Sequence, residues 1–204
     1  MEFWAGILIG FVLSVLLTAG FWALTMKILT PKLEAYDPRG QVGGALKLVE
    51  TKRHDGVWSY QFNVENSGRR HAIDVEFSCT LFSTGWASDE GTRIATISLP
   101  VTTGRIGIMP AHRSRRNRKH PLAFLGPRVV TFNTKVTEFQ ARKLPPEHQS
   151  EACTGKLRLS ELMALGNDSL VSVTIYAYDN FSGSRNVFTD AIARVEDIHA
   201  AAVP

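Results

Sequence analysis

The hydrophobic pattern of the chain begins with a run that contains no charged residue, FWAGILIGFVLSVLLTAGFWALTM, from Phe3 to Met26. A helix of these 24 residues would be about 36 Å long, enough to cross a hydrocarbon core of about 30 Å with some tilt. Trp4 and Trp22, near its two ends, suit the aromatic belts of the membrane–water interfaces. The pattern predicts a transmembrane helix of the signal-anchor type within residues 1–29.

The alternative to an anchor is a cleaved secretory signal, which needs a basic start, a shorter apolar run and a small-x-small cleavage site. The chain starts Met1-Glu2 and offers no good site, which favours the anchor. Cytoplasmic flanks are rich in Lys and Arg. None precedes the helix, and six follow it: Lys27, Lys32, Arg39, Lys47, Lys52 and Arg53. We therefore expect a single-pass protein of the plasma or inner membrane with its C-terminal part in the cytoplasm.

After the helix, apolar and polar residues alternate with a period of two, as in strands that bury one face. The clearest cases are WSYQFNV (58–64), IDVEFSCTL (73–81) and LVSVTIYAY (170–178). Turn signals follow at HDG (54–56), NSG (66–68) and NFSG (180–183). Further strands are expected at 45–50, 92–99, 128–137 and 187–195. The pattern predicts a mainly β chain, in which an immunoglobulin-like antiparallel β-sandwich follows the N-terminal transmembrane helix.

The domain boundaries follow from the same pattern. Residues 30–44, with two Pro and three Gly and no apolar period, indicate a linker, so that the sandwich would occupy 45–204. One further helix is indicated by LSELMALGN, where Ser160 would cap the start and Gly166 would end it. We expect the least ordered stretch at 140–156.

Charge adds one feature, the segment HRSRRNRKH at 112–120, which holds five Lys and Arg and no acid. Removing these five from the 23 Lys and Arg leaves 18 against 19 Asp and Glu, so this segment carries the whole positive excess. Pro110 and Pro121 bracket it and indicate a loop. We call it the Arg-rich loop, and its basic residues are Arg113, Arg115, Arg116, Arg118 and Lys119.

Four interpretations of the Arg-rich loop remain open. Anionic lipid leads, because clustered basic residues near a membrane are attracted to its headgroups. An acidic protein partner and a solvated loop without a specific role follow. Nucleic acid is disfavoured, because its surfaces spread basic residues over a face and interleave aromatic ones.

The membrane helix carries a second candidate feature, a strip of small residues with a spacing of four: Gly6, Gly10, Ser14 and Thr18. Such a strip lets another helix approach closely, which would support self-association or contact with another membrane protein. Because small residues are common in membrane helices in any case, a packing seam and an incidental strip both remain open.

Candidate chemistry is otherwise sparse. The six His are scattered, and no zinc-binding spacing, phosphate-binding loop or nucleophile elbow is present. Asp179 is interpreted as the residue that opens a hairpin turn, and His71 as a solvated residue at a strand entry. Cys79 belongs to a core pattern whereas Cys153 follows polar residues, which favours two reduced thiols over a disulfide. We expect no catalysis, no metal and no cofactor.

Two segments carry a resemblance to a known family: WSYQFNVENSGRRHAIDVEFSCTLF (58–82) and VSVTIYAYDNFSGSRNVFTDAIARVEDI (171–198). They resemble the strands of the cytoplasmic domain of inward-rectifier potassium channels. The second segment also resembles the end of uncharacterised bacterial proteins that pair one N-terminal membrane helix with a sandwich. The resemblance implies an immunoglobulin-like sandwich in the cytosol beneath a membrane. Pore function does not carry over, because the chain has one membrane helix and no Thr-Val-Gly-Tyr-Gly filter.

These observations favour a non-catalytic interaction or scaffold module: a membrane-anchored sandwich whose Arg-rich loop contacts anionic lipid or an acidic partner. The alternative is a sandwich on the periplasmic or extracellular side that binds a ligand or serves the envelope. A third class, an enzyme with an unrecognised site, would require convergent acids and His in a cleft.

Overall fold

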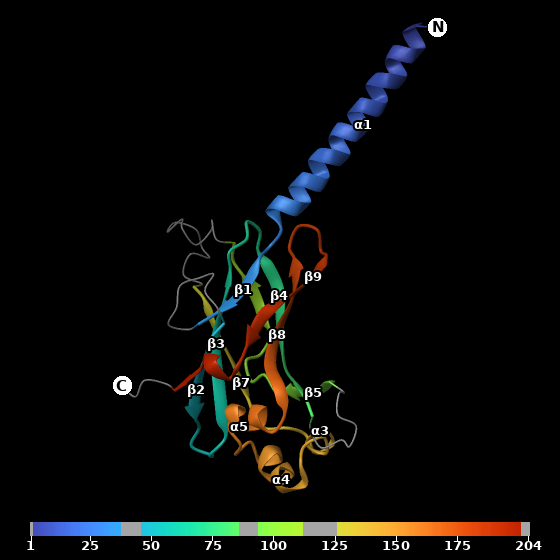
Figure 1. Ribbon diagram of the computed structural model, residues 1–204. Coiled ribbons are helices and arrows are strands. Elements are labelled where there is room, and N and C mark those ends of the chain that lie inside the picture. Colours follow the sequence, from blue (N-terminus) through green and yellow to red (C-terminus); the bar gives the residue numbers. More distant parts are fainter. Residues whose placement is uncertain (1, 38–45, 86–93, 112–125, 201–204) are drawn as a thin grey trace.

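The computed structural model describes residues 2–37, 46–85, 94–111 and 126–200, and shows two β-sheets that face each other, with one long helix leaving one end (Figure 1). The helix, α1 (Glu2–Leu29), is long and apolar enough to span a membrane between Gly6 and Thr25. The prediction of a mainly β sandwich after an N-terminal apolar helix is confirmed.

The first sheet is built around β3 (Trp58–Asn66). Strand β7 (Arg128–Asn133) pairs antiparallel along one edge of β3. The other edge is shared, β2 (Leu48–Lys52) pairing with the first half of β3 and β1 (Leu33–Tyr36) with the second half. The short β10 (Ile198–Ala200) extends this sheet beside β2 and runs parallel to it, which departs from the purely antiparallel prediction.

The second sheet is built around β4 (Ala72–Thr84), which pairs antiparallel with β8 (Asn167–Asp179) over nearly its whole length. Strand β9 (Arg185–Ala193) continues the sheet beyond β8. On the other side of β4, β5 (Ile94–Leu99) and β6 (Ile106–Met109) share the edge. The β8–β9 turn lies at the end of the sandwich from which α1 leaves (Figure 1).

The core lies between the two sheets and follows the predicted alternation, except at the start of β4, where a bulge between Ile73 and Glu76 buries Ala72 in place of Ile73. In the first sheet Tyr60 and Phe62 are fully buried and pack on Phe132, with ring centroids 5.5 and 6.3 Å apart. In the second sheet Cys79 is fully buried, and so are the alternating positions of β8, Val171, Val173, Ile175 and Ala177. Every residue of this core lies beyond Thr30, and the described side chains of α1 make no part of it.

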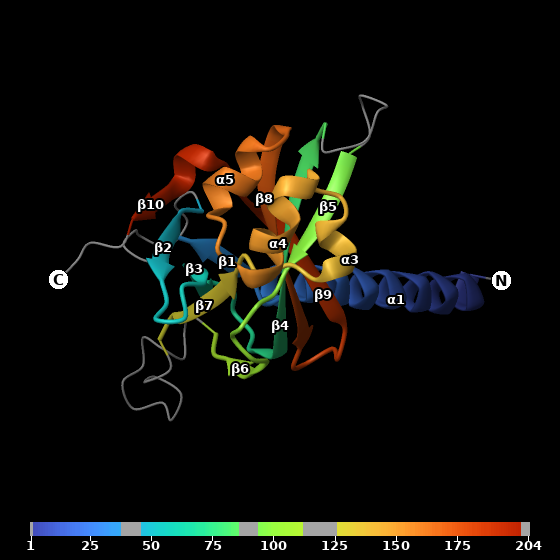
Figure 2. The ribbon, with the colours of Figure 1, turned by 90° about the horizontal axis from the view of Figure 1, so that it is seen from below.

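Three short helices cover the end of the sandwich opposite α1: α3 (Glu138–Ala141), α4 (Pro146–Thr154) and α5 (Leu159–Ala164) (Figures 1 and 2). The prediction that 140–156 is the least ordered stretch is wrong, because Leu144 and Ala152 anchor these helices in the core. A single-turn 3-10 helix, η1 (Val195–Asp197), precedes β10.

The start of α5 also differs from the prediction. Its N-cap residue is Arg158, and Ser160 lies inside the first turn, so Ser160 is not the cap. The Glu161 carboxylate accepts the Arg158 backbone N–H at 2.7 Å, while the Tyr60 hydroxyl accepts the next N–H, that of Leu159, at 2.8 Å. A core tyrosine thus satisfies a helix terminus that the sequence assigned to a serine.

The stretch predicted as a linker, 30–44, contains β1, whose residues Leu33 and Tyr36 are buried against the core. Strand β1 follows α1 after only three residues and is hydrogen-bonded to β3. The helix therefore enters the first sheet directly, without an intervening flexible segment in residues 30–36.

Candidate functional site

The helix α1 is exposed along its described length, and its two tryptophans, Trp4 and Trp22, project from near its two ends with 73% and 61% of their surface exposed. An apolar helix of this length does not stay in water without a partner, because about twenty apolar side chains would be hydrated. Its length and composition suit a lipid bilayer.

The predicted strip of small residues lies on α1, where Gly6, Gly10, Ser14 and Thr18 are all exposed. The Thr18 hydroxyl donates a hydrogen bond to the Ser14 carbonyl at 2.8 Å, so it is satisfied within the helix. Ser14 and Thr18 line a shallow apolar hollow of about 390 Å³ next to Trp22. A Cβ at Gly6 or Gly10 would touch nothing within 4 Å, so no part of the described chain packs there.

The junction between α1 and the sandwich is held by the β3–β4 turn. The Asn66 side-chain carbonyl accepts the Lys32 N–H at 3.1 Å, and the Lys32 carbonyl accepts the Ser67 N–H at 2.9 Å. Gly68 lies so close to the chain here that a Cβ would stand 2.3 Å from the Lys32 nitrogen. The helix exit is therefore packed backbone to backbone on the sandwich.

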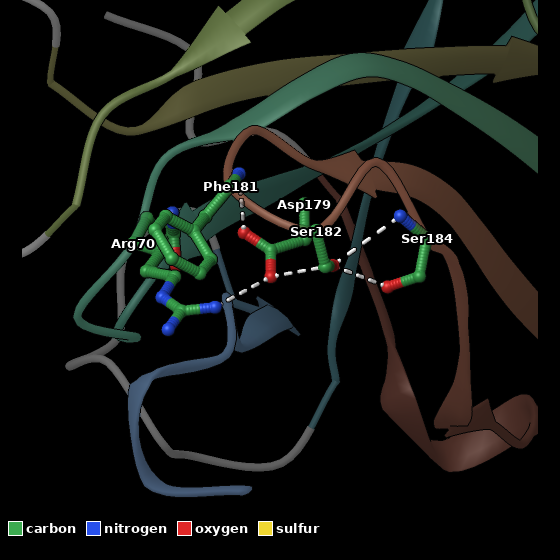
Figure 3. A network of polar contacts seen from close by, with 6 residues as sticks. Arg70, Asp179, Phe181, Ser182 and Ser184 are labelled. Atoms are coloured by element: carbon green, nitrogen blue, oxygen red, sulfur yellow. Dashed lines mark hydrogen bonds and ion pairs between the residues drawn. The ribbon is translucent and has the colours of Figure 1, made fainter. Parts of the chain in front are cut away.

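A network of polar contacts joins the β3–β4 turn to the β8–β9 turn at the end of the sandwich from which α1 leaves (Figure 3). The Asp179 carboxylate, 1% exposed, accepts hydrogen bonds from the Phe181 N–H at 3.1 Å and from the Ser182 hydroxyl at 2.9 Å. It also pairs with the Arg70 guanidinium at 3.0 Å. The same guanidinium lies over the Phe181 ring, 4.1 Å from its centroid. Asp179 and Arg70 thus fix the β8–β9 turn onto the β3–β4 turn.

The charge state of Asp179 follows from this geometry. Burial alone would raise the pKa of its carboxyl group, but the hydrogen bonds from Phe181 and Ser182 and the ion pair with Arg70 outweigh burial. The pKa of Asp179 is therefore held below its ordinary value of 3.8, and the carboxylate is ionised at neutral pH. Its prediction as the residue that opens the hairpin turn is confirmed.

The flanks of the Arg-rich loop lie at the same end of the sandwich. The Met109 carbonyl accepts a hydrogen bond from the Asn66 side-chain amide at 3.1 Å, and Met109 pairs with Ala72 at the start of β4. On the other flank Arg128 pairs with Val64, two residues before Asn66. The loop itself, with Arg113, Arg115, Arg116, Arg118 and Lys119, lies outside the described residues.

His71 has a role that its sequence context did not suggest. Its Nδ1 accepts the backbone N–H of Ala111, the last described residue before the Arg-rich loop, at 3.0 Å. Its carbonyl accepts the Asn180 N–H from the β8–β9 turn. The prediction of a merely solvated residue is wrong, because His71 ties both neighbouring segments to the β3–β4 turn.

Arg70 is the residue of this site that sequence reasoning missed. Its partner Asp179 is 109 positions away in the sequence, and only the folded sheet brings the two together. The one local signal was the basic pair Arg69-Arg70 directly after a turn glycine, which does not distinguish a buried partner from a solvated charge.

The site carries no array suited to a metal: among the described residues, no group of three or more His, Cys, Asp or Glu is placed to bind an ion. Cys79 and Cys153 are both free thiols. Neither a comparison with models of protein families nor a comparison with curated proteins gives a match for the chain.

Proposed function

We propose that the chain is a single-pass membrane protein whose β-sandwich is a non-catalytic interaction module that contacts anionic lipid of the same membrane through the Arg-rich loop. One observation carries the proposal. The helix α1 and both described flanks of the Arg-rich loop leave the sandwich at the same end. A basic loop anchored beside a membrane helix is held close to the headgroups.

The reach of the loop supports this contact. A chain extends by about 3.4 Å per residue, so the segment between Ala111 and Gly126 can carry its midpoint up to about 25 Å from its anchor points. Five Lys and Arg near an anionic surface contribute about 1 kcal/mol each, or at most about 5 kcal/mol before ordering costs. The anchor raises the local concentration of the loop at the lipid, so this modest attraction suffices.

The cytosolic side is supported by the excess of Lys and Arg after α1 and by the resemblance to cytoplasmic domains of inward-rectifier channels. Anionic phospholipids are concentrated in the cytoplasmic leaflet, which agrees with a basic loop on that side. The module would act as a scaffold at the membrane surface.

We also propose that the strip formed by Gly6, Gly10, Ser14 and Thr18 is a packing seam for a second membrane helix, in a copy of this chain or in another protein. The support is its full exposure on α1 and the open space around its two glycines. Small side chains let two backbones approach closely enough for van der Waals contact to hold the helices together in lipid.

The lipid contact is tested with a fragment of residues 30–204, which keeps β1 and every residue of the core. It should bind vesicles that contain phosphatidylserine, and the binding should fall as salt rises, because exposed charge is screened beyond about 8 Å at physiological ionic strength. A variant with the five basic residues changed to Ser should lose vesicle binding and keep its melting temperature, since exposed charges contribute little to folding.

A matched control replaces Lys135, Arg142 and Lys156 by Ser, because these exposed basic residues lie at the opposite end of the sandwich. This control should bind vesicles as the parent does. Equal binding by the five-Ser variant, or no dependence on lipid charge, would contradict the lipid contact and leave an acidic protein as the partner of the loop.

A further inference from the structure

The β8–β9 turn presents an aromatic side chain to the outside. Phe181 is 68% exposed although its turn is held by hydrogen bonds to the Asp179 carboxylate. Its backbone N–H is fixed by Asp179, and its ring is covered on one face by the Arg70 guanidinium. These contacts therefore hold the Phe181 ring in a fixed position outside the core (Figure 3).

The Phe181 ring and the end of α1 line the same hollow. Trp22 and Thr30 of the helix exit line one side of a hollow of about 500 Å³, and Asp179, Phe181, Ser182 and Ser184 line the other. Trp22 lies within the part of α1 that is long and apolar enough to span a membrane, whereas Thr30 follows the last residue of the helix. Phe181 thus lies at the height where α1 would pass from the bilayer into water.

The tilt of α1 brings the same turn toward the bilayer. In both views the helix leans to the side of the sandwich that carries β5 and β9, away from β2 (Figures 1 and 2). A membrane perpendicular to such a helix meets the β8–β9 turn before it meets the edge formed by β2. The turn is therefore the part of the second sheet nearest to the membrane surface.

The charges around Phe181 suit a lipid surface. The charges of Arg70 and Asp179 cancel in an ion pair of 3.0 Å, so no net buried charge lies beside the Phe181 ring. Arg69, in the neighbouring β3–β4 turn, is exposed, and so is the Lys32 side chain at the helix exit, which pairs with Glu34 at 2.7 Å. An exposed aromatic ring next to a turn that carries an exposed Arg matches the interface of a membrane, where rings occupy the headgroup layer and cations meet phosphates.

We propose that the β8–β9 turn is a second, aromatic membrane contact, in which Phe181 inserts into the interfacial layer of the bilayer that α1 spans. This inference rests on the proposed anchoring of α1. With α1 and Phe181 both in the bilayer, the sandwich is attached at two points and has a defined orientation on the membrane. The occupant of this surface is lipid of the same leaflet.

The test uses the full chain, one copy per lipid nanodisc, so that a second copy cannot cover the turn. Asn180, which is exposed beside Phe181, is replaced by Cys and labelled with an environment-sensitive fluorophore in a Cys153→Ser background. Cys79 is fully buried and does not react. The label should show a blue-shifted emission and should lose most of its quenching by iodide in water.

Two substitutions make the result specific. Phe181→Ser should restore iodide quenching of the label, whereas Phe181→Trp should keep the label shielded. Phe139→Ser is the matched control, because Phe139 is 76% exposed on α3 at the opposite end of the sandwich and its loss should change nothing. Resistance of Cys79 to thiol reagents verifies that each variant is folded.

The experiment distinguishes a failure of the anchoring by α1 from a failure of the insertion of Phe181. A chain that does not stay with the lipid after an alkaline carbonate wash contradicts the anchoring by α1. A chain that stays with the lipid, but whose label at position 180 is quenched by iodide as fully as a label attached through Phe139→Cys, contradicts the insertion of Phe181 alone. Equal shielding of the label in the parent and in Phe181→Ser also contradicts the insertion and points to a protein contact through other residues.

Discussion

The junction between α1 and the sandwich gives the sharpest mutational prediction, Gly68→Ala. A Cβ at position 68 would lie 2.3 Å from the Lys32 nitrogen, 2.7 Å from the Thr30 oxygen and 2.8 Å from the Pro31 carbonyl carbon. All three atoms belong to the backbone that connects α1 with β1, so no side chain can rotate away to make room. The helix exit has to move off the β3–β4 turn.

The cost of this movement is set by the bonds it breaks. The Ser67–Lys32 and Lys32–Asn66 hydrogen bonds contribute about 1 kcal/mol each. Retaining them would instead require strain of about 1–3 kcal/mol, as in overpacked cores. Either way we expect a loss of about 2 kcal/mol. In a domain of this size 1 kcal/mol shifts the melting temperature by about 2–4 °C, so the melting temperature should fall by about 4–8 °C.

Thermal unfolding in detergent, followed by circular dichroism of the strands, measures this effect. Gly104→Ala is the control, because a Cβ at that exposed position meets nothing within 4 Å. In addition, protease should cut between α1 and β1 faster in Gly68→Ala than in the parent, since the junction loses its contacts. If Gly68→Ala melted like the control and resisted the protease equally, the helix would not be packed on the sandwich and the reasoning would be refuted.

Three further predictions concern single residues. Asp179→Asn should destabilise the sandwich by about 3 kcal/mol at pH 7, because it removes the buried negative charge that pairs with the Arg70 guanidinium. Because the pKa of Asp179 is depressed, the stability difference between the parent and Asp179→Asn should be complete above the ordinary value of 3.8 and should shrink as pH falls below it. The two melting temperatures should therefore lie closer together at pH 3 than at pH 7. Gly10→Ile should weaken helix association in detergent because a β-branched side chain blocks close approach, and an unchanged size on gel filtration would mean that the strip is incidental. Thiol reagents should label Cys153 in the native protein and Cys79 only after unfolding, since burial raises the pKa of the Cys79 thiol and excludes the reagent; equal rates would contradict the core position of Cys79.

The sequence predicted well the strands that have one buried and one solvated face. β3 and β8 alternate over many residues, and the alternation of β8 matches its buried positions one for one. In β4 the predicted alternation holds from Val75 onward, because a bulge between Ile73 and Glu76 puts Ala72 in the core in place of Ile73. The turn residues Asp55, Asn66 and Asp179 also act locally, each accepting a backbone N–H two residues on, so short motifs sufficed to find them.

The short elements could not be predicted, because three or four residues do not establish a period. β1, β6 and β10 gain their stability from pairing with strands that are distant in the sequence. In the stretch 140–156, two consecutive prolines and several polar residues indicated a loop, yet Pro146 opens α4, a position where the missing N–H costs nothing. Burial of Leu144 and Ala152 then decides the structure.

The features of the candidate site also divide into those that the sequence predicted and those that depend on the folded structure. The small strip of α1 and the charge of the Arg-rich loop follow from spacing and composition alone. The pairing of Arg70 with Asp179, the bond from His71 to Ala111 and the exposed position of Phe181 depend on how the two turns meet. No local pattern encodes a contact between residues that only the sheet order brings together.

The central claim, a sandwich held on the cytosolic side of the membrane by α1, is tested most directly by labelling Cys153 with a membrane-impermeant maleimide in cells. Cys153 is partly exposed and Cys79 is buried, so the label reports one position in the sandwich. The account predicts a membrane-bound chain that is labelled only after the cells are permeabilised. Labelling of Cys153 in intact cells would place the sandwich outside and contradict the account.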